Sequence, residues 1–111
     1  MNSDIVDEYY KVLRIVEKNP DYTQRKIANE LGYSLGKVNY LIAALAAKGI
    51  LKLQRFLKSK NKFGYRYVLT SRGIKEKYNI TKTFLQRKMK EYEVLSREIE
   101  EARDVLRNGS L

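Results

Sequence analysis

The chain has 111 residues, of which 43% are hydrophobic and 32% charged, and its 23 Lys and Arg outnumber its 13 Asp and Glu, for a net charge of +10. This length fits one domain with an appendage, and the apolar fraction is too high for a disordered chain. Because cysteine and histidine are absent, a disulfide, a thiolate nucleophile, a Ser-His-Asp triad and a Cys/His zinc site are excluded.

Two helices are predicted near the N-terminus. Apolar residues recur at helical spacing over 4–18, and Pro20 ends this helix because proline disfavours helical geometry in the residue before it. A second helix, 23–31, has Thr23 as its N-cap and ends at Gly32, which supplies the break.

A third helix is predicted over 34–48, and together with the second it has the pattern of a helix-turn-helix. That motif needs a small residue where the two helices cross, a glycine in the turn and a branched apolar residue on the second of them. Ala28, Gly32 and Val38 meet these needs at the expected offsets. We expect the third helix to bury Val38, Leu41, Ile42 and Leu45.

A β-hairpin is predicted after the third helix. Two segments, 51–57 and 65–69, are rich in leucine or aromatic residues, and the polar segment between them contains Asn and Gly. We expect this segment to form a long, flexible, basic tip. Three helices followed by a two-stranded hairpin is the order of elements in a winged helix-turn-helix.

The chain returns to helix after the hairpin, with an interruption expected near Asn79 and a long charged helix over 81–107. Its apolar residues have the heptad spacing of a coiled-coil seam, weakened by Lys88: Leu85, Met89, Tyr92, Leu95, Ile99, Ala102 and Leu106. A helix of about 40 Å cannot bury this stripe against a small core, so we expect a homodimer through this helix. An antiparallel pair would bring basic residues up to Lys90 against acidic ones from Glu91, although a parallel pair stays open.

The predicted fold class is therefore mainly α, an α+β winged helix with a three-helix core, a two-stranded β wing and a long C-terminal dimerisation helix. We expect residues 1–79 to form the winged helix-turn-helix domain and 80–111 the coiled-coil helix.

The positive charge is concentrated in one stretch of the sequence. Residues 1–48 have a balance of +1, residues 49–90 have thirteen Lys and Arg against one Glu, and residues 91–111 have a balance of −3. Such a strict exclusion of acids favours a polyanionic partner over a merely solvated surface. Charge alone does not choose between nucleic acid and an anionic membrane.

A family resemblance rests on the segments NPDYTQRKIANELGYSLGKVNYLI, KGILKLQRF and KSKNKFGYRYVLTSRGI, and on the basic helix after them. These segments resemble the small MarR-type winged-helix regulators, most closely the group associated with exopolysaccharide loci. The resemblance covers about residues 10–100 and implies a dimeric bacterial or archaeal transcription regulator. No small-effector pocket is apparent from the sequence.

In such a protein the N-terminal half of the third helix, 34–48, enters the major groove of DNA. The residues that we expect to face outward there are Ser34, Gly36, Lys37, Asn39 and Tyr40. Lys37 can donate to guanine or to a phosphate, Asn39 can contact adenine, and Tyr40 can reach a phosphate or a sugar. Alanines fill much of the remaining helix, so we expect modest sequence readout.

The hairpin tip, 57–64, is the second candidate contact, on the DNA backbone or in the minor groove. Its polar residues are Lys58, Lys60, Asn61 and Lys62. Arg25 and Lys26, at the start of the second helix, are expected to clamp a backbone phosphate.

The partner that we expect is double-stranded DNA, bound by a cytoplasmic, nucleoid-associated homodimer with no cofactor, metal or membrane. A winged-helix module for RNA or protein interaction stays open as the alternative. A membrane-surface protein is less favoured because the acidic residues from Glu91 onward would repel anionic lipid. An enzyme is the weakest alternative, since the sequence has no Gly-rich phosphate loop and we expect Gly64 and Gly73 in turns.

Overall fold

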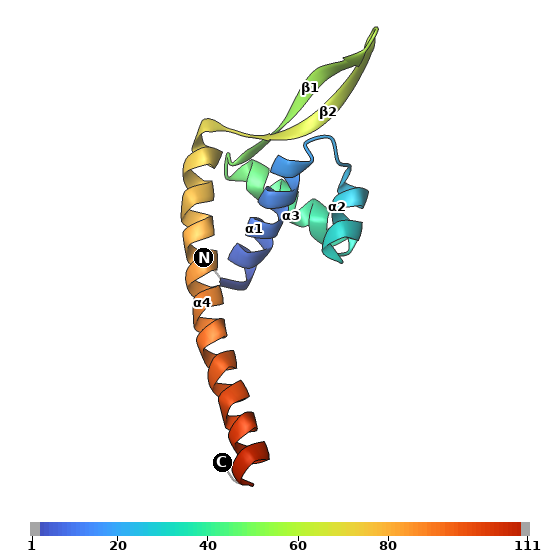
Figure 1. The fold of residues 1–111 in the computed structure, drawn as a ribbon. Helices are drawn as coiled ribbons and strands as arrows, with labels where there is room; N and C mark the ends of the chain where they lie inside the picture. Colours follow the sequence, from blue (N-terminus) through green and yellow to red (C-terminus); the bar gives the residue numbers. More distant parts are fainter. Residues whose placement is uncertain (1–2, 110–111) are drawn as a thin grey trace.

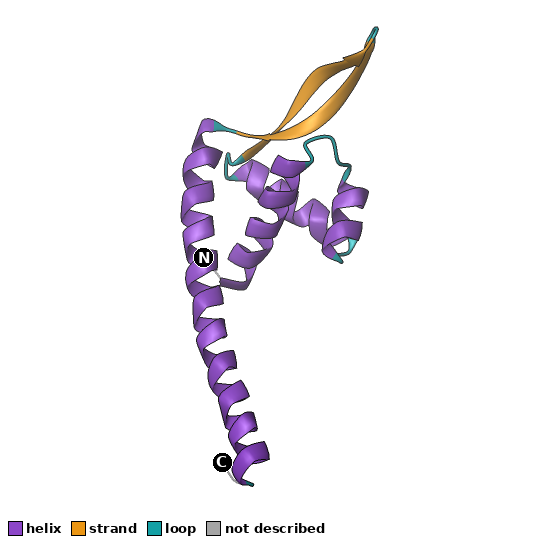
Figure 2. Cartoon of the chain, in the orientation of Figure 1, coloured by secondary structure: helices purple, strands orange, loops and turns teal. Residues whose placement is uncertain are grey.

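The structure, a computed structural model, describes residues 3–109, so the outer ends of the two predicted domains (1, 2, 110 and 111) lie outside the described residues. Its elements in chain order are α1 (Ser3–Lys18), α2 (Gln24–Leu31), α3 (Leu35–Ala47), β1 (Leu51–Ser59), β2 (Lys62–Leu69) and α4 (Ser71–Asn108). The first three helices pack together, the two strands project from them, and α4 runs past the bundle and beyond it (Figures 1 and 2). The predicted winged-helix fold class is confirmed.

The core lies where α1, α2 and α3 meet the base of the hairpin and the first turns of α4. Val12, Ile27, Val38 and Leu45 have no exposed surface. Among the described residues every fully buried side chain is apolar, and each such burial contributes about 1.5–3 kcal/mol. This burial, rather than helix propensity, holds the three short helices in place.

The helix-turn-helix is closed by local signals that the sequence contains. The hydroxyl oxygen of Thr23 accepts a hydrogen bond from the Lys26 amide, and that of Ser34 accepts one from the Lys37 amide, both at 3.1 Å. Gly32 adopts a left-handed conformation with φ of 70°, which glycine reaches at little cost. The predicted N-cap at Thr23 and the predicted turn glycine are therefore confirmed, and Ser34 is the N-cap of α3.

The hairpin is more regular than the sequence indicated. The strands run antiparallel almost to the tip, where Ser59 pairs with Lys62, and a bulge lies between Leu57 and Ser59. Asn61 forms the turn with a positive φ of 56°, a conformation that asparagine tolerates better than most residues. The expected long flexible loop over 58–64 is therefore wrong, because the strands continue through most of it.

Gly64 lies within β2 and not in a turn, which corrects the prediction for this residue. It is paired across the hairpin with Phe56, and an added Cβ would lie 3.3 Å from the Phe56 ring. The glycine thus leaves room for the ring to lie across the opposite strand.

Helix α4 is continuous over 38 residues, so the interruption expected near Asn79 is wrong. Asparagine inside a helix costs less than about 1 kcal/mol relative to alanine, and Ile80, which is only 4% exposed, packs in the core next to it. Burial of Ile80 outweighs the weak helix propensity of Asn79.

The junction between the wing and α4 is tight. The Thr70 hydroxyl accepts a hydrogen bond from the Gly73 amide at 2.9 Å and itself donates to the Gly49 carbonyl. Gly73 lies inside the first helical turn of α4, whereas a loop turn was expected for it. Only glycine fits at this position, because an added Cβ would lie 2.2 Å from the Ile50 carbonyl oxygen. The glycine therefore lets the helix start directly against the base of β1.

The two halves of α4 have different surroundings. The N-terminal half packs along α1, where the Tyr10 and Phe84 rings stack with centroids 3.9 Å apart, whereas the C-terminal half projects away from the rest of the chain (Figure 1). The predicted seam residues on α4 are all exposed, and the exposed fraction of the large ones runs from 43% for Ile99 to 88% for Leu106. None of the helices in residues 3–109 combines the length and the apolar character needed to cross a membrane.

Candidate nucleic-acid interface

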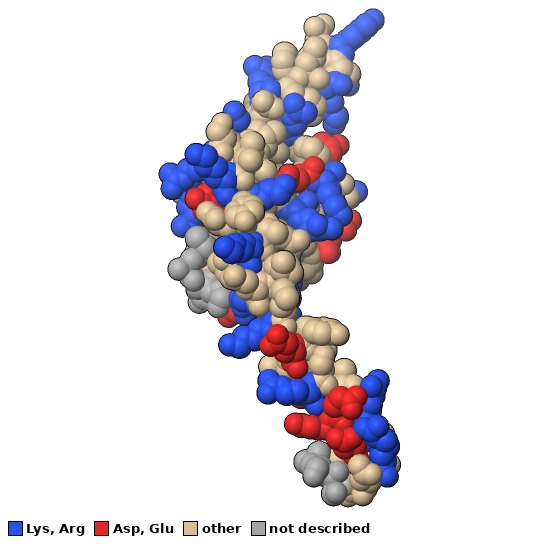
Figure 3. Space-filling model, turned by 60° about the vertical axis from the view of Figure 1, so that its left-hand side comes forward, with Lys and Arg blue, Asp and Glu red and all other residues tan. Residues whose placement is uncertain are grey.

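The stretch of chain that contains the end of α2, all of α3 and the wing has no acidic residues of its own. No Asp or Glu occurs between Leu31 and Lys75 in the sequence. Figure 3 shows Lys and Arg but no Asp or Glu on the wing, whereas Asp and Glu lie among Lys and Arg on the body and on the far part of α4. The charge asymmetry of the sequence is therefore also an asymmetry in space.

Helix α3 presents the predicted outward residues at its N-terminal end. Val38, Leu41 and Leu45 point into the core, as predicted. The five candidate residues are all exposed: Ser34, Gly36, Lys37, Asn39 and Tyr40. The side chain of Tyr40 is 61% exposed, so it extends from the helix toward solvent.

Lys37 is held by α1 and by the turn of the motif. Its Nζ lies 2.9 Å from Oε2 of Glu8 and 4.3 Å from the centroid of the Tyr33 ring. The hydrogen bond with Glu8 raises the pKa of the Lys37 ammonium, while burial and the Glu8 charge raise the pKa of the Tyr33 hydroxyl. Lys37 therefore stays charged, but its position in the unbound protein is set by Glu8.

Asn39 belongs to a hydrogen-bonded chain that joins three elements. Its Nδ2 donates to Oε1 of Gln24 at 3.3 Å, and Nε2 of Gln24 donates to the Tyr67 hydroxyl at 3.0 Å. This chain connects α3 to α2 and to the base of β2. Sequence reasoning did not identify Gln24, and no local signal could have done so because its partners are distant in the sequence.

The two basic candidates on α2 lie at its first turn and are exposed. Lys26 has its Nζ 5.1 Å from the centroid of the Tyr22 ring, while the side chain of Arg25 extends into solvent. Both lie beside the amide groups of the helix N-terminus, a position that favours an anion.

The wing carries its candidate residues at the tip, separate from those of α3. Lys58, Lys60, Asn61 and Lys62 are all exposed. Two further arginines of the hairpin lie over aromatic rings. The guanidinium of Arg55 is 3.8 Å from the Phe63 centroid, and that of Arg66 is 5.0 Å from the Phe56 centroid. Arg66 also donates to Oε1 of Gln54 at 2.9 Å.

A groove of about 440 Å³ separates the wing from the segment that precedes α2. Its walls are formed by Pro20, Asp21 and Thr23 on one side, and by Phe56, Lys58, Gly64, Tyr65 and Arg66 on the other. Arg66 and Lys58 make the wing side of this groove basic.

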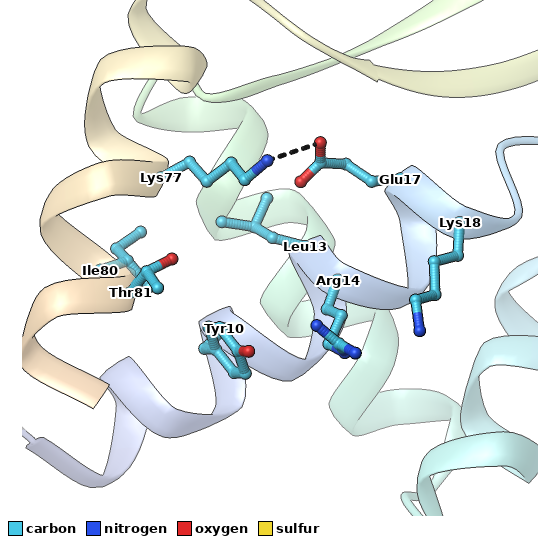
Figure 4. Close-up of a pocket in the computed structure, with 8 residues that line it drawn as sticks. All are labelled: Tyr10, Leu13, Arg14, Glu17, Lys18, Lys77, Ile80 and Thr81. Atoms are coloured by element: carbon cyan, nitrogen blue, oxygen red, sulfur yellow. Dashed lines mark hydrogen bonds and ion pairs between the residues drawn. The ribbon is translucent and has the colours of Figure 1, made fainter. Parts of the chain in front are cut away.

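A second hollow, about 290 Å³, lies between α1 and α4 (Figure 4). The sequence did not reveal it because its lining comes from two helices far apart in the chain. Lys77 and Glu17 form an ion pair of 2.9 Å across it, and Tyr10, Leu13 and Ile80 supply apolar surface. Among the described residues no group of acidic side chains is arranged to hold a metal ion.

Comparison with known families gives one match, and it covers the helix-turn-helix. Residues 10–52 match the family described as winged helix-turn-helix DNA-binding. This segment spans most of α1, all of α2 and α3, and the start of β1. No curated protein matches the sequence.

Solved structures show the same fold at low sequence identity. The transcriptional repressor CouR bound to a 23-mer DNA duplex is 22% identical, with a TM-score of 0.61 over 87% of this chain and 68% of that one. ZitR of Lactococcus lactis is 17% identical, with a TM-score of 0.61 over 93% of this chain and 76% of that one. MarR of Staphylococcus aureus, in complex with salicylate and kanamycin, is 18% identical, with a TM-score of 0.52 over 90% and 67% of the two chains.

Proposed function

We propose that this chain, a winged helix-turn-helix protein with the fold of the MarR-type regulators, is a transcriptional regulator that binds double-stranded DNA. The observation that carries the proposal is the stretch from Leu31 to Lys75, which includes α3 and the wing and contains no acidic residue. The match of residues 10–52 to a DNA-binding family supports it. A DNA-bound regulator would be cytoplasmic and associated with the nucleoid.

Helix α3 is proposed to enter the major groove with its N-terminal half. The exposed residues available there are Ser34, Gly36, Lys37, Asn39 and Tyr40. Lys37 must exchange Glu8 for a base or a phosphate, and Asn39 must turn from Gln24 to reach an adenine. Because both side chains already have partners within the protein, only contacts that replace those partners give net affinity.

The wing is proposed to bind the DNA backbone and the adjacent minor groove. Lys58, Lys60 and Lys62 have no acidic neighbours on the hairpin, so they are available to neutralise phosphates. Arg25 and Lys26 would hold a further phosphate at the start of α2.

A homodimer through α4 is proposed because the helix exposes a long apolar stripe, weakened at one seam position by Lys88. The heptad spacing of Leu85 and Tyr92 extends back to Ile74 and Tyr78, which are 64% and 69% exposed. The break expected near Asn79 had hidden this extension in the sequence. A two-fold pair of helices would bury the stripe and present two copies of α3 to an inverted repeat.

Charge favours an antiparallel pair. Residues 71–90 contain seven Lys and Arg against one Glu, whereas residues 91–108 contain six acidic residues and three Arg. An antiparallel arrangement places the basic half of each helix beside the acidic half of its copy, and a parallel one places like charges together.

Selection of binding sites from random duplex DNA tests the proposal. Enrichment of an inverted repeat is the expected result, because it requires both sequence readout and a two-fold dimer. Binding of duplex RNA with equal affinity, or no binding to any nucleic acid, would contradict the proposal. Analytical ultracentrifugation tests assembly separately: the full chain should sediment as a dimer, and a variant lacking 91–111 as a folded monomer.

A further inference from the structure

Two apolar side chains stand near the end of the wing. Leu57 is 62% exposed and Phe63 is 53% exposed. They face each other across the hairpin, and theirs is the last regular pair before the bulge and the turn. Exposed apolar surface at the end of a projection calls for a reason, since it is unfavourable in water.

The fold does not use these two side chains. The core cluster reaches the hairpin only at its base, with Leu51 buried and Tyr67 and Leu69 packed against it. Leu57 and Phe63 lie toward the opposite end of the strands. Their contribution to the stability of the isolated chain is therefore small.

The face that carries them makes contact with the helix-turn-helix near the base of the wing. Successive side chains on a strand alternate between faces, so Leu57 and Phe63 share a face with the cross-strand pair Leu53 and Tyr67. The Tyr67 hydroxyl accepts its hydrogen bond from Gln24 on α2. This face thus continues from the helix-turn-helix outward to the tip.

The surroundings of the pair are cationic. Lys58, Lys60 and Lys62 flank it in the sequence, and the Arg55 guanidinium lies 3.8 Å from the Phe63 centroid and restrains the ring. A partner for this tip must therefore be a polyanion that also offers an apolar interior. The stacked bases inside the phosphate walls of a DNA minor groove have both properties.

We infer that Leu57 and Phe63 form a wedge that inserts between base pairs from the minor groove and kinks the duplex. The inference rests on the proposed DNA binding and adds to it a mode of recognition. Side chains inserted in this way kink DNA by roughly 20–90°. Flexible pyrimidine–purine steps such as TA are the easiest to open. The wedge therefore favours DNA sites that contain such steps, which adds sequence selectivity to the modest readout by the alanine-rich α3.

The test uses the full chain, short duplexes with fluorophores at both ends to report bending, and 2-aminopurine at single TA steps to report unstacking. The double variant Leu57→Ala/Phe63→Ala removes the wedge. Leu53→Ala is the matched control, because Leu53 lies on the same face, is 56% exposed and is nearer the bundle. Phe63→Leu keeps an apolar tip and tests rescue, and far-ultraviolet circular dichroism verifies that each variant folds.

We expect wild type, Leu53→Ala and Phe63→Leu to bend the duplex and to raise 2-aminopurine fluorescence. The double variant should bind with an unchanged salt dependence, produce neither signal, and lose a preference of roughly tenfold for duplexes that contain TA steps. Lys60→Ala/Lys62→Ala should weaken binding and still kink the duplex at saturation.

Three results would overturn the inference. The double variant could bend DNA as wild type does, or wild type could bind duplexes tightly and leave them straight. The double variant could also lose binding only to phosphatidylserine vesicles and retain its full effect on DNA, which would assign the tip to a lipid surface. A wild-type protein that binds no duplex at all would be a different outcome, because it removes the proposed function as well.

Discussion

Helix α3 and the wing differ in how far the fold already engages their side chains. In α3, four of 13 residues are buried, and the two best candidates for base contacts are held by Glu8 and by Gln24. In the outer half of the wing no side chain is buried, and cationic and apolar groups face solvent together. The helix is thus primarily a structural element with few free polar groups. At the wing tip Arg55 covers Phe63, but the lysines have no acidic partner on the hairpin that would compete with a ligand.

The largest expected difference between the two regions is in stability. Leu41→Ala should lower the free energy of unfolding by about 3 kcal/mol, because Leu41 is 1% exposed and its loss leaves a cavity. Leu57→Ala is the matched change on the wing and should alter stability by less than about 0.5 kcal/mol. Urea denaturation followed by circular dichroism measures both, and equal effects would mean that the wing tip is packed in solution.

The next effect concerns the electrostatic part of binding. Lys60→Ala/Lys62→Ala should weaken binding to all duplexes alike, because two phosphate contacts and their counterion release are lost. The slope of log affinity against log salt should fall in magnitude by about two. Fluorescence anisotropy at several salt concentrations measures the slope, and an unchanged value would remove the wing from the interface.

A smaller and sequence-dependent effect is expected on α3. Lys37→Ala should cost about 1–3 kcal/mol on the selected site and little on random DNA, if the lysine leaves Glu8 for a base. Competition binding with both duplexes gives the two values. A uniform loss on every sequence would assign Lys37 to the backbone and leave α3 with still less readout.

The smallest effect should come from releasing Lys37. Glu8→Gln removes the 2.9 Å ion pair and one negative charge near α3, so DNA affinity should rise by a few fold. Because contact with Glu8 raises the already high pKa of Lys37, the ammonium stays charged near neutrality, and the gain should be constant between about pH 6 and pH 8. A decrease in affinity would mean that Glu8 positions Lys37 for DNA rather than restraining it.

The local features of the fold could be predicted from the sequence, because each depends on residues near one another. Thr23, Ser34 and Gly32 define the turn of the motif through short-range hydrogen bonds and backbone geometry. The errors at Gly73 and Asn79 have another origin. The intrinsic propensities of glycine and asparagine predict a turn at Gly73 and a helix break at Asn79. Packing against Ile50 and burial of Ile80 in the core make both positions helical instead.

The candidate site could be predicted only as a set of residues. Helical periodicity predicted the exposure of the α3 candidates, and the polar, basic composition of 58–62 predicted that of the wing candidates; both sets are exposed in the structure. Their partners were not predictable, because Glu8 and Gln24 reach Lys37 and Asn39 only through tertiary packing. The order in the wing tip also escaped prediction, since polar residues are compatible with both a loop and a strand.

The close contact of Gly73 with Ile50 gives α4 the mechanical role of a lever. The base of the wing and the start of α4 are locked together there, and α4 continues without a break for 38 residues, or about 57 Å. If α4 pivots by about 5° about its C-terminal turns, its other end, which carries the base of the wing, moves by about 5 Å. This movement is larger than the roughly 3.4 Å between successive bases on a DNA strand. The contacts that hold the C-terminal turns of α4 therefore determine where along a duplex the wing can reach, because a small rotation there becomes a large movement of the wing.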